Sequence, residues 1–178
     1  MKKILMVSAL SSIFATGILA SQESNKGMSS IQLGVTKAIY NGGNTGDSKI
    51  YFGTDLMVPL ATDTSAFYFG VGFDLVAIDG VSSTSSTYGN YTLGAQAKVG
   101  YSLAPLIGWN VNLKADVGYG VTRWISSNYW GAQYSASIDT EVYNGWGIGY
   151  KYKHVNTGIS GNIFDSYNTN IFFLEKTF

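Results

Sequence analysis

Apolar and polar residues alternate with a period of two along most of the chain after Met28. In the segment 67–75, for example, large apolar residues take every second position, and the residues between them are Tyr68, Gly70, Gly72 and Asp74. A period of two is that of a β-strand, whereas an amphipathic helix repeats every 3.6 residues. Eight such runs occur, at 31–39, 50–60, 67–75, 91–103, 109–119, 130–142, 146–152 and 171–178. The pattern predicts an all-β chain of eight strands, of which the last is the least regular.

The segments between the runs alternate between long and short. The long ones are Asn41–Ser48, Asp79–Gly89 and Val155–Tyr167, with Arg123–Asn128 of modest length, and the short ones are Ala61–Ser65, Ala104–Gly108 and Asn144-Gly145. Asn-Gly between two alternating runs is a strong signal for a tight hairpin. An even number of strands with long loops on one side and short turns on the other predicts an antiparallel up-and-down barrel whose two rims face different compartments.

The first twenty residues have the layout of a secretory signal peptide. Lys2 and Lys3 precede a mainly apolar run that ends at Ala20, and a polar segment follows. This order of a basic, an apolar and a small-residue region is typical of export signals. We therefore expect a signal peptide at 1–20, a short periplasmic segment at 21–27 and a barrel domain at 28–178, with the exact cleavage site left open.

The side-chain volumes on the two faces of the strands predict which face points outward. A barrel of eight strands encloses only enough room for modest side chains or one small ligand. One face carries bulky aromatic and aliphatic residues on all eight strands, which would overfill such a lumen, while the other face is rich in Gly, Ser and Thr. With the bulky face toward lipid, closure pairs every backbone group, so we expect a transmembrane barrel. A soluble lipocalin-like carrier is a more distant alternative.

Most charged residues of the strands fall on the small, inward face. We expect them to form ion pairs that fill the lumen, because an unpaired buried charge is costly. The expected lumen network consists of Asp55, Asp74, Lys98, Lys114, Asp116, Asp139, Glu141, Lys151, Lys153 and Glu175. Lys37 and Lys176 fall on the outward face, near strand ends, where a lysine can reach the headgroups.

Aromatic residues lie toward the ends of several strands, as a membrane-interface girdle requires. The expected girdle consists of Tyr101, Trp109, Trp130, Trp146, Tyr152 and Phe178.

Composition agrees with this picture. Charged residues make up 12% and aromatic residues 15%, with 22 Gly, 2 Pro and no Cys. Lysines and arginines balance the acids at eleven each, so without Lys2 and Lys3 the remainder has a slight negative charge, and no nucleic acid is expected as a partner. The lack of cysteine, together with a single histidine, predicts no disulfide, metal site or cofactor.

The export signal, the eight alternating strands and the final Phe178 resemble the small outer-membrane barrels of Gram-negative bacteria, of the OmpA/OmpX or opacity-like, porin-like type. The segment 147–152, Gly-Ile-Gly-Tyr-Lys-Tyr, is similar to a penultimate strand common in that group. The resemblance implies location in the outer membrane, contact with its lipids and lipopolysaccharide, and assembly by the barrel-assembly machinery. That machinery would read Phe172, Leu174 and Phe178, although Lys176 departs from the usual apolar pattern.

The single histidine, His154, is the weak candidate for catalysis. Its surroundings faintly resemble a segment of the PagL-type lipid A deacylases, in which a His base precedes a Ser nucleophile by two residues. Here that position holds Asn156, whose amide cannot attack an ester. Ser160 lacks the spacing, and Asp165 could orient His154 only if its loop folded back. Asp139 and Glu141 share a face, and they are expected as lumen partners of lysines rather than as a catalytic pair.

The sequence thus predicts a non-enzymatic, monomeric outer-membrane barrel with a structural or surface-interaction role. Its polar, nearly uncharged long loops suit contact with a surface ligand. A narrow porin-like channel and a lipid A deacylase using His154 remain the alternatives.

Overall fold

The structure is a computed structural model that describes residues 28–40, 43, 45–60, 66–78, 90–124, 127–158 and 165–178. The expected signal peptide, the segment 21–27 and the long loop at 79–89 lie outside these residues. Among the described residues, no helix has the length and apolar character needed to cross a membrane.

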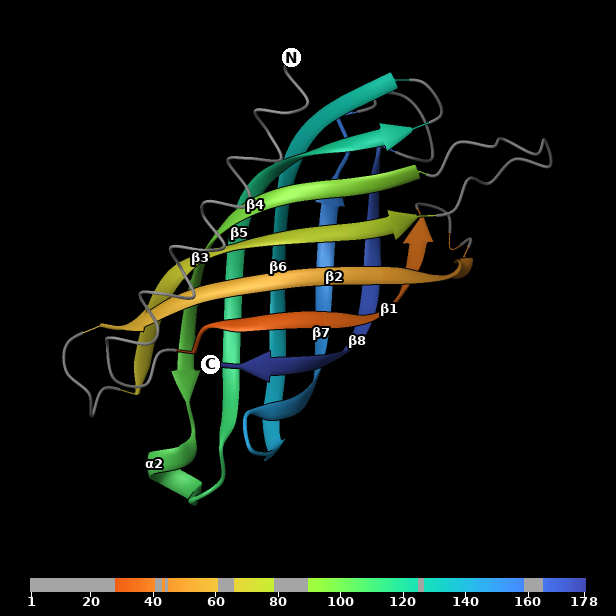
Figure 1. Cartoon of the computed structure of the whole chain (residues 1–178). Coiled ribbons are helices and arrows are strands. Elements are labelled where there is room, and N and C mark those ends of the chain that lie inside the picture. The colour runs from red at the N-terminus through yellow and green to blue at the C-terminus, as the bar shows by residue number, and fades with distance from the viewer. Residues whose placement is uncertain are drawn as a thin grey trace, which may run out of the picture.

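Eight antiparallel strands form a closed barrel in which each strand pairs with its neighbours in sequence and β8 pairs with β1 (Figure 1). The strands are β1 (Ser30–Tyr40), β2 (Thr45–Pro59), β3 (Phe67–Ile78), β4 (Asn90–Ser102), β5 (Val111–Trp124), β6 (Ser127–Tyr143), β7 (Trp146–Asn156) and β8 (Ser166–Thr177). The predicted all-β, up-and-down barrel is therefore confirmed.

The pairing register fixes the dimensions of the barrel. Following paired residues from Ser30 through all eight strands leads back to β1 at Tyr40, ten residues further along. With ~3.3 Å per residue and ~4.8 Å between strands, this stagger tilts the strands by ~40° and gives a backbone radius of ~8 Å. Such a lumen has room for side chains and little else.

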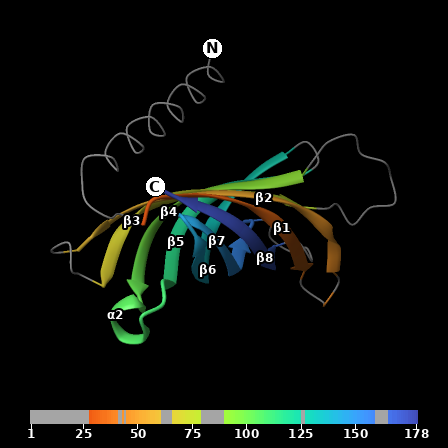
Figure 2. The same cartoon turned by 60° about the horizontal axis from the view of Figure 1, so that its bottom comes forward.

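The two ends of the barrel differ. At the end that we call the turn end, the helix α2 (Ala104–Ile107) joins β4 to β5, the Asn144-Gly145 turn joins β6 to β7, and the C-terminus lies beside the start of β1 (Figures 1 and 2). Asn144 and Gly145 have φ angles of 46° and 76°, as the tight hairpin predicted for Asn-Gly requires. The opposite end, which we call the loop end, carries the β1–β2, β3–β4, β5–β6 and β7–β8 connections.

Two loop-end connections are shorter than the alternation predicted. β2 begins at Thr45, so that Thr45–Ser48 belongs to a strand rather than to the first long loop. Likewise β5 and β6 are paired up to Trp124 and Ser127, which leaves only residues 125–126 between them. Polar residues concealed these strand ends, because a strand beyond the apolar band needs no apolar face.

The bulky apolar residues point away from the barrel axis. Phe69, Leu113 and Ile148, from three separate strands, are 47%, 42% and 51% exposed. Every strand contributes at least one exposed large apolar residue, whereas most strand charges are buried inside. The outward direction predicted for the bulky face is the one observed.

Candidate functional site

Lys114 is the centre of one ion cluster inside the barrel. Its Nζ lies 3.1 Å from Asp55, 3.0 Å from Asp139 and 3.4 Å from Glu175. Lys98 shares Asp55 at 3.2 Å, so that five strands contribute to one group of charges around these two lysines. All of these side chains are at most 3% exposed.

Asp74 is the centre of a second cluster, closer to the loop end. It lies 2.9 Å from Lys153 and 3.2 Å from Lys151, and it accepts hydrogen bonds from Gln96 at 3.0 Å and Tyr51 at 2.8 Å. This carboxylate therefore has two cations and two neutral donors around it, the surroundings that a buried charge requires.

Gln32 joins the two clusters. Its side-chain amide donates to Asp55 at 2.8 Å, and its carbonyl accepts from Tyr51 at 2.8 Å. Asp116 completes the set, with Lys98 at 3.0 Å and a hydrogen bond from Ser135 at 2.5 Å. Five carboxylates and four ammonium groups are thus held in one polar network that fills the middle of the barrel.

Glu141, which we expected in this network, lies elsewhere. It is exposed at the turn end, where its carboxylate accepts hydrogen bonds from the Asn110 amide at 2.5 Å and the Gly145 N–H at 2.6 Å. The register between β6 and β7 shifts after Glu141, and the carboxylate there holds the hairpin instead of a lumen lysine.

Inward-facing glycines make room for the large side chains of the lumen. A Cβ on Gly72 would collide with the side chain of Lys98, and one on Gly149 would collide with the ring of Phe173. The buried ring of Phe173 in turn packs against Tyr51, with 6.2 Å between the ring centroids. Small and large residues on neighbouring strands therefore fit together across the narrow interior.

The loop end of the lumen is filled by an apolar and aromatic cluster that we did not predict from the sequence. Tyr40 packs against Trp124 and Tyr167 with ring centroids 6.5 Å and 6.0 Å apart, and Ile78 and Val155 are buried beside them. These residues occupy the inward positions of their strands, where we had expected only small and polar side chains. The alternation along the strands already places these residues on the inward face, so the sequence did contain a signal for this cluster.

At the turn end the lumen contains two methionines. Met57 is fully buried and Met28 is 8% exposed, and both side chains lie near Gly100. Apolar side chains therefore lie at both ends of the charged network.

The residues expected in the aromatic girdle lie at several levels of the outer wall. Trp109, Trp146 and Phe178 are exposed near the turn end, and Tyr101 packs there against Phe67 with 4.6 Å between centroids. The remaining two lie further toward the loop end: Trp130 stacks on Tyr119 at 6.2 Å, and Tyr152 lies midway along β7. The expected assembly residues Phe172 and Leu174 point outward from β8, at 62% and 58% exposure.

His154 points outward from β7 and is half-buried. Its Nδ1 lies 2.8 Å from the Asn168 side-chain oxygen, and its ring stacks on Tyr134 with 4.7 Å between centroids. Asn168, not Asp165, is therefore the residue that orients the imidazole. Asn156, two residues beyond His154, accepts a hydrogen bond from the Gly158 N–H at 2.9 Å, and it offers no nucleophile.

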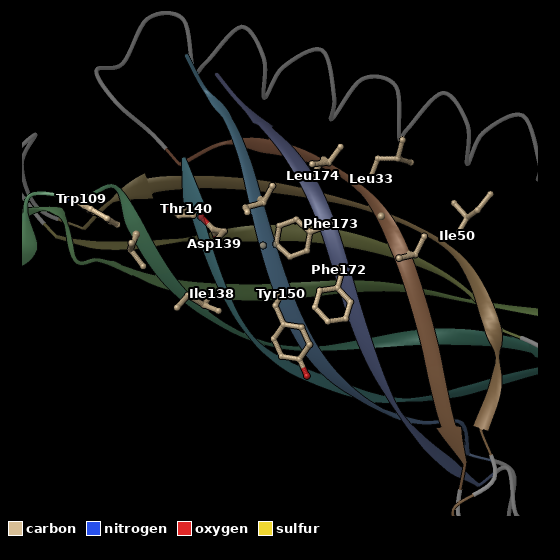
Figure 3. A pocket seen from close by; sticks show the side chains of 15 residues that line it. Leu33, Ile50, Trp109, Ile138, Asp139, Thr140, Tyr150, Phe172, Phe173 and Leu174 are labelled. Carbon is tan, nitrogen blue, oxygen red and sulfur yellow. The ribbon is translucent and has the colours of Figure 1, made fainter. Parts of the chain in front are cut away.

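A broad, open depression of about 940 Å³ lies on the outer wall (Figure 3). Its lining is almost entirely apolar and comes mainly from β6, β7, β8 and β1, with Ile50 of β2 on one side, and Val111 of β5 with the preceding Trp109 on the other. Outward-facing residues among the lining include Leu33, Val35, Ile50, Ile138, Ile148, Phe172 and Leu174.

Comparison with solved structures identifies the class of fold. The attachment invasion locus protein Ail of Yersinia pestis superposes with a TM-score of 0.53 and 12% identity, over 85% of this chain and 98% of Ail. Neisserial surface protein A superposes with a TM-score of 0.52 and 11% identity, over 84% of this chain and 96% of that protein. No protein-family model and no curated protein sequence matches. The chain thus has the fold of the small eight-stranded outer-membrane barrels.

Proposed function

We propose that the protein is an integral protein of the bacterial outer membrane with a structural and surface-contact role. The observation that carries this proposal is the exposure of large apolar residues on all eight strands around a charged interior. In water such a wall would be an aggregation hazard, whereas in a bilayer it is the stable arrangement. The apolar 1–20 segment supports export by a signal peptide.

The interior supports a structural rather than a conducting role. The ion network fills the middle of a lumen whose backbone radius is only ~8 Å, and apolar side chains fill both ends. A channel needs a continuous polar path, and none is evident along the described residues. The outer wall and the loops are then the surfaces through which the protein acts.

The similar proteins support contact at the cell surface. Ail is described as an attachment and invasion protein, and the Neisserial protein as a surface protein. In this chain the corresponding surface would be formed by the loop end, where Ser, Thr, Asn and Tyr predominate in the longer connections. Such residues give adaptable hydrogen bonding to a ligand.

Fractionation together with electrophoresis tests the proposal. The full chain, expressed in a Gram-negative host, should sediment with the outer membrane and resist extraction by carbonate. The unboiled protein should migrate apart from the boiled protein, because a closed barrel stays folded in detergent. Recovery of the mature chain in the soluble periplasmic fraction would refute the proposal.

A further inference from the structure

We infer that the outer wall formed by β6, β7, β8, β1 and β2 carries a specific site for one phosphorylated lipid with several acyl chains, in the outer leaflet. This inference rests on the proposed membrane location. It comes from two features that meet on this wall: the apolar depression and a polar row directly above it, toward the loop end.

The depression supplies the part of the site that would hold acyl chains. Two rows of paired outward residues line it, one containing Val35, Phe172 and Tyr150 and the next containing Leu33 and Leu174. At ~4.8 Å between strands, five strands make it ~20 Å wide, enough for several chains lying side by side. A single narrow groove would fit one chain, so the width favours a multiply acylated lipid.

The polar row begins one outward position above the depression. On neighbouring strands it brings together Lys37, Asn170 and Tyr152, with Ser48 paired to Lys37 from β2. Tyr150 connects the two levels, because its hydroxyl donates to the Asn170 side-chain oxygen at 2.5 Å. Lys37 is exposed and forms no ion pair with any residue in the described part of the chain. Its cation is therefore available to an anionic headgroup.

The next outward level adds the imidazole of His154 as a hydrogen-bond acceptor. His154 is paired with Asn168, and an amide oxygen can only accept, so Nδ1 carries the proton in their 2.8 Å hydrogen bond. The remaining ring nitrogen, Nε2, then carries a lone pair and can accept a hydrogen bond from a hydroxyl of the lipid headgroup. Stacking on Tyr134 fixes the plane of the ring. Lys37 on β1 and His154 on β7 thus lie on either side of Asn168 and Asn170 on β8, above an apolar floor.

The height of this row agrees with a headgroup position. Gly118 on β5 is linked to Tyr167 on β8 by a path of paired residues through Gln133 and Val155. Because neighbouring strands are staggered, this path rises by ~9 Å toward the loop end. Asn170 lies three residues from Tyr167 toward the turn end of β8, which places it ~7 Å below Tyr167. Asn170 is therefore at about the same height along the barrel axis as Tyr119, across the barrel. Tyr119 stacks there on Trp130, and such aromatic pairs are typical of the membrane interface.

Native mass spectrometry of the full chain in detergent tests the inference, with bis-phosphorylated lipid A as the probe. We expect one tightly retained lipid per barrel, and weaker retention of dephosphorylated lipid A and of phosphatidylethanolamine. Lys37→Gln should weaken binding of the bis-phosphorylated form at least about fivefold, as loss of one lysine at a charged lipid surface does. Lys49→Gln is the matched control, because Lys49 carries the same charge from the opposite face of β2.

The apolar half has its own variant and control. Val35→Trp places a bulky ring in the depression and should reduce retention of both lipid A forms, whereas Val117→Trp on β5, which is also exposed but lies outside the depression, should not. Each variant is first shown to be folded by its heat-modifiable migration. Equal binding of bis-phosphorylated lipid A by the parent, Lys37→Gln and Val35→Trp would overturn the inference, as would equal retention of phosphatidylethanolamine. A folded outer-membrane protein with that result would leave the proposed function intact, whereas a soluble periplasmic protein would overturn both.

Discussion

Replacing Lys114 by methionine tests whether the lumen charges hold the barrel together. The ammonium group lies within 3.4 Å of Asp55, Asp139 and Glu175, and the side chain is 3% exposed. Methionine keeps most of the length and volume but removes the charge. Asp55 would keep Lys98 as a partner, while Glu175 would lose the cation it shares. Leaving a buried charge without its partner costs about 3–5 kcal/mol, and we expect a loss of stability in that range.

Guanidinium unfolding in liposomes, followed through the fluorescence of the four tryptophans, measures this loss. Adding Glu175→Gln to Lys114→Met should recover about 1–2 kcal/mol, because it removes one of the carboxylates left without a partner. Lys176→Met is the matched control at the turn end. Its Nζ donates to the Asn144 carbonyl at 2.6 Å and lies 5.6 Å from the Trp146 ring centroid in a partly exposed position, so its loss should cost less than about 1 kcal/mol. If Lys114→Met unfolds within about 1 kcal/mol of the parent, the charged network does not stabilise the barrel.

Three further predictions concern the packing of the lumen, its closure and the chemistry of the outer wall. Gly149→Ala should destabilise by about 1–3 kcal/mol in the same assay, because its Cβ would collide with Phe173, and Phe173→Leu should restore most of the loss. The purified protein should show no steady conductance in planar bilayers, since Tyr167 and its neighbours fill the loop end; reproducible single-channel steps would favour a channel instead. His154→Ala should leave the mass spectrum of cellular lipid A unchanged, and disappearance of a deacylated species in that variant would indicate an enzyme.

The barrel could be predicted from the sequence because two simple physical constraints act on every strand. The pleat sends alternate side chains to opposite faces, and a narrow lumen cannot hold the bulkier set. Phe69, Leu113 and Ile148 therefore had to face outward, and they do. The two constraints act on all strands together, so the prediction held although the alternation of the last strand is irregular. That strand, β8, pairs with β1 along its length.

The arrangement inside the lumen could not be read in the same way. Alternation shows that a residue faces inward but not which side chain it meets, since that depends on the ten-residue stagger around the barrel. Lys151 and Asp74, for example, lie on strands that are not paired with each other, and their 3.2 Å contact crosses the lumen. For the same reason, the packing of Tyr40 against Trp124 and the departure of Glu141 from the network could not be anticipated from spacing alone.

The same inverted distribution of residues, from which we propose a membrane location, also bears on where a ligand could bind. In a soluble domain the apolar core confers stability and the polar surface recognises ligands, but here the large apolar residues face outward and most charged side chains contact one another inside. Asp55 and Asp74 contact lysines and amides, so a solute entering the lumen would have to displace those contacts. Specific recognition is then left to residues that face outward with polar atoms to spare. On the described part of the outer wall, Lys37 and His154 above the depression meet that condition, and this is why we place the lipid site there.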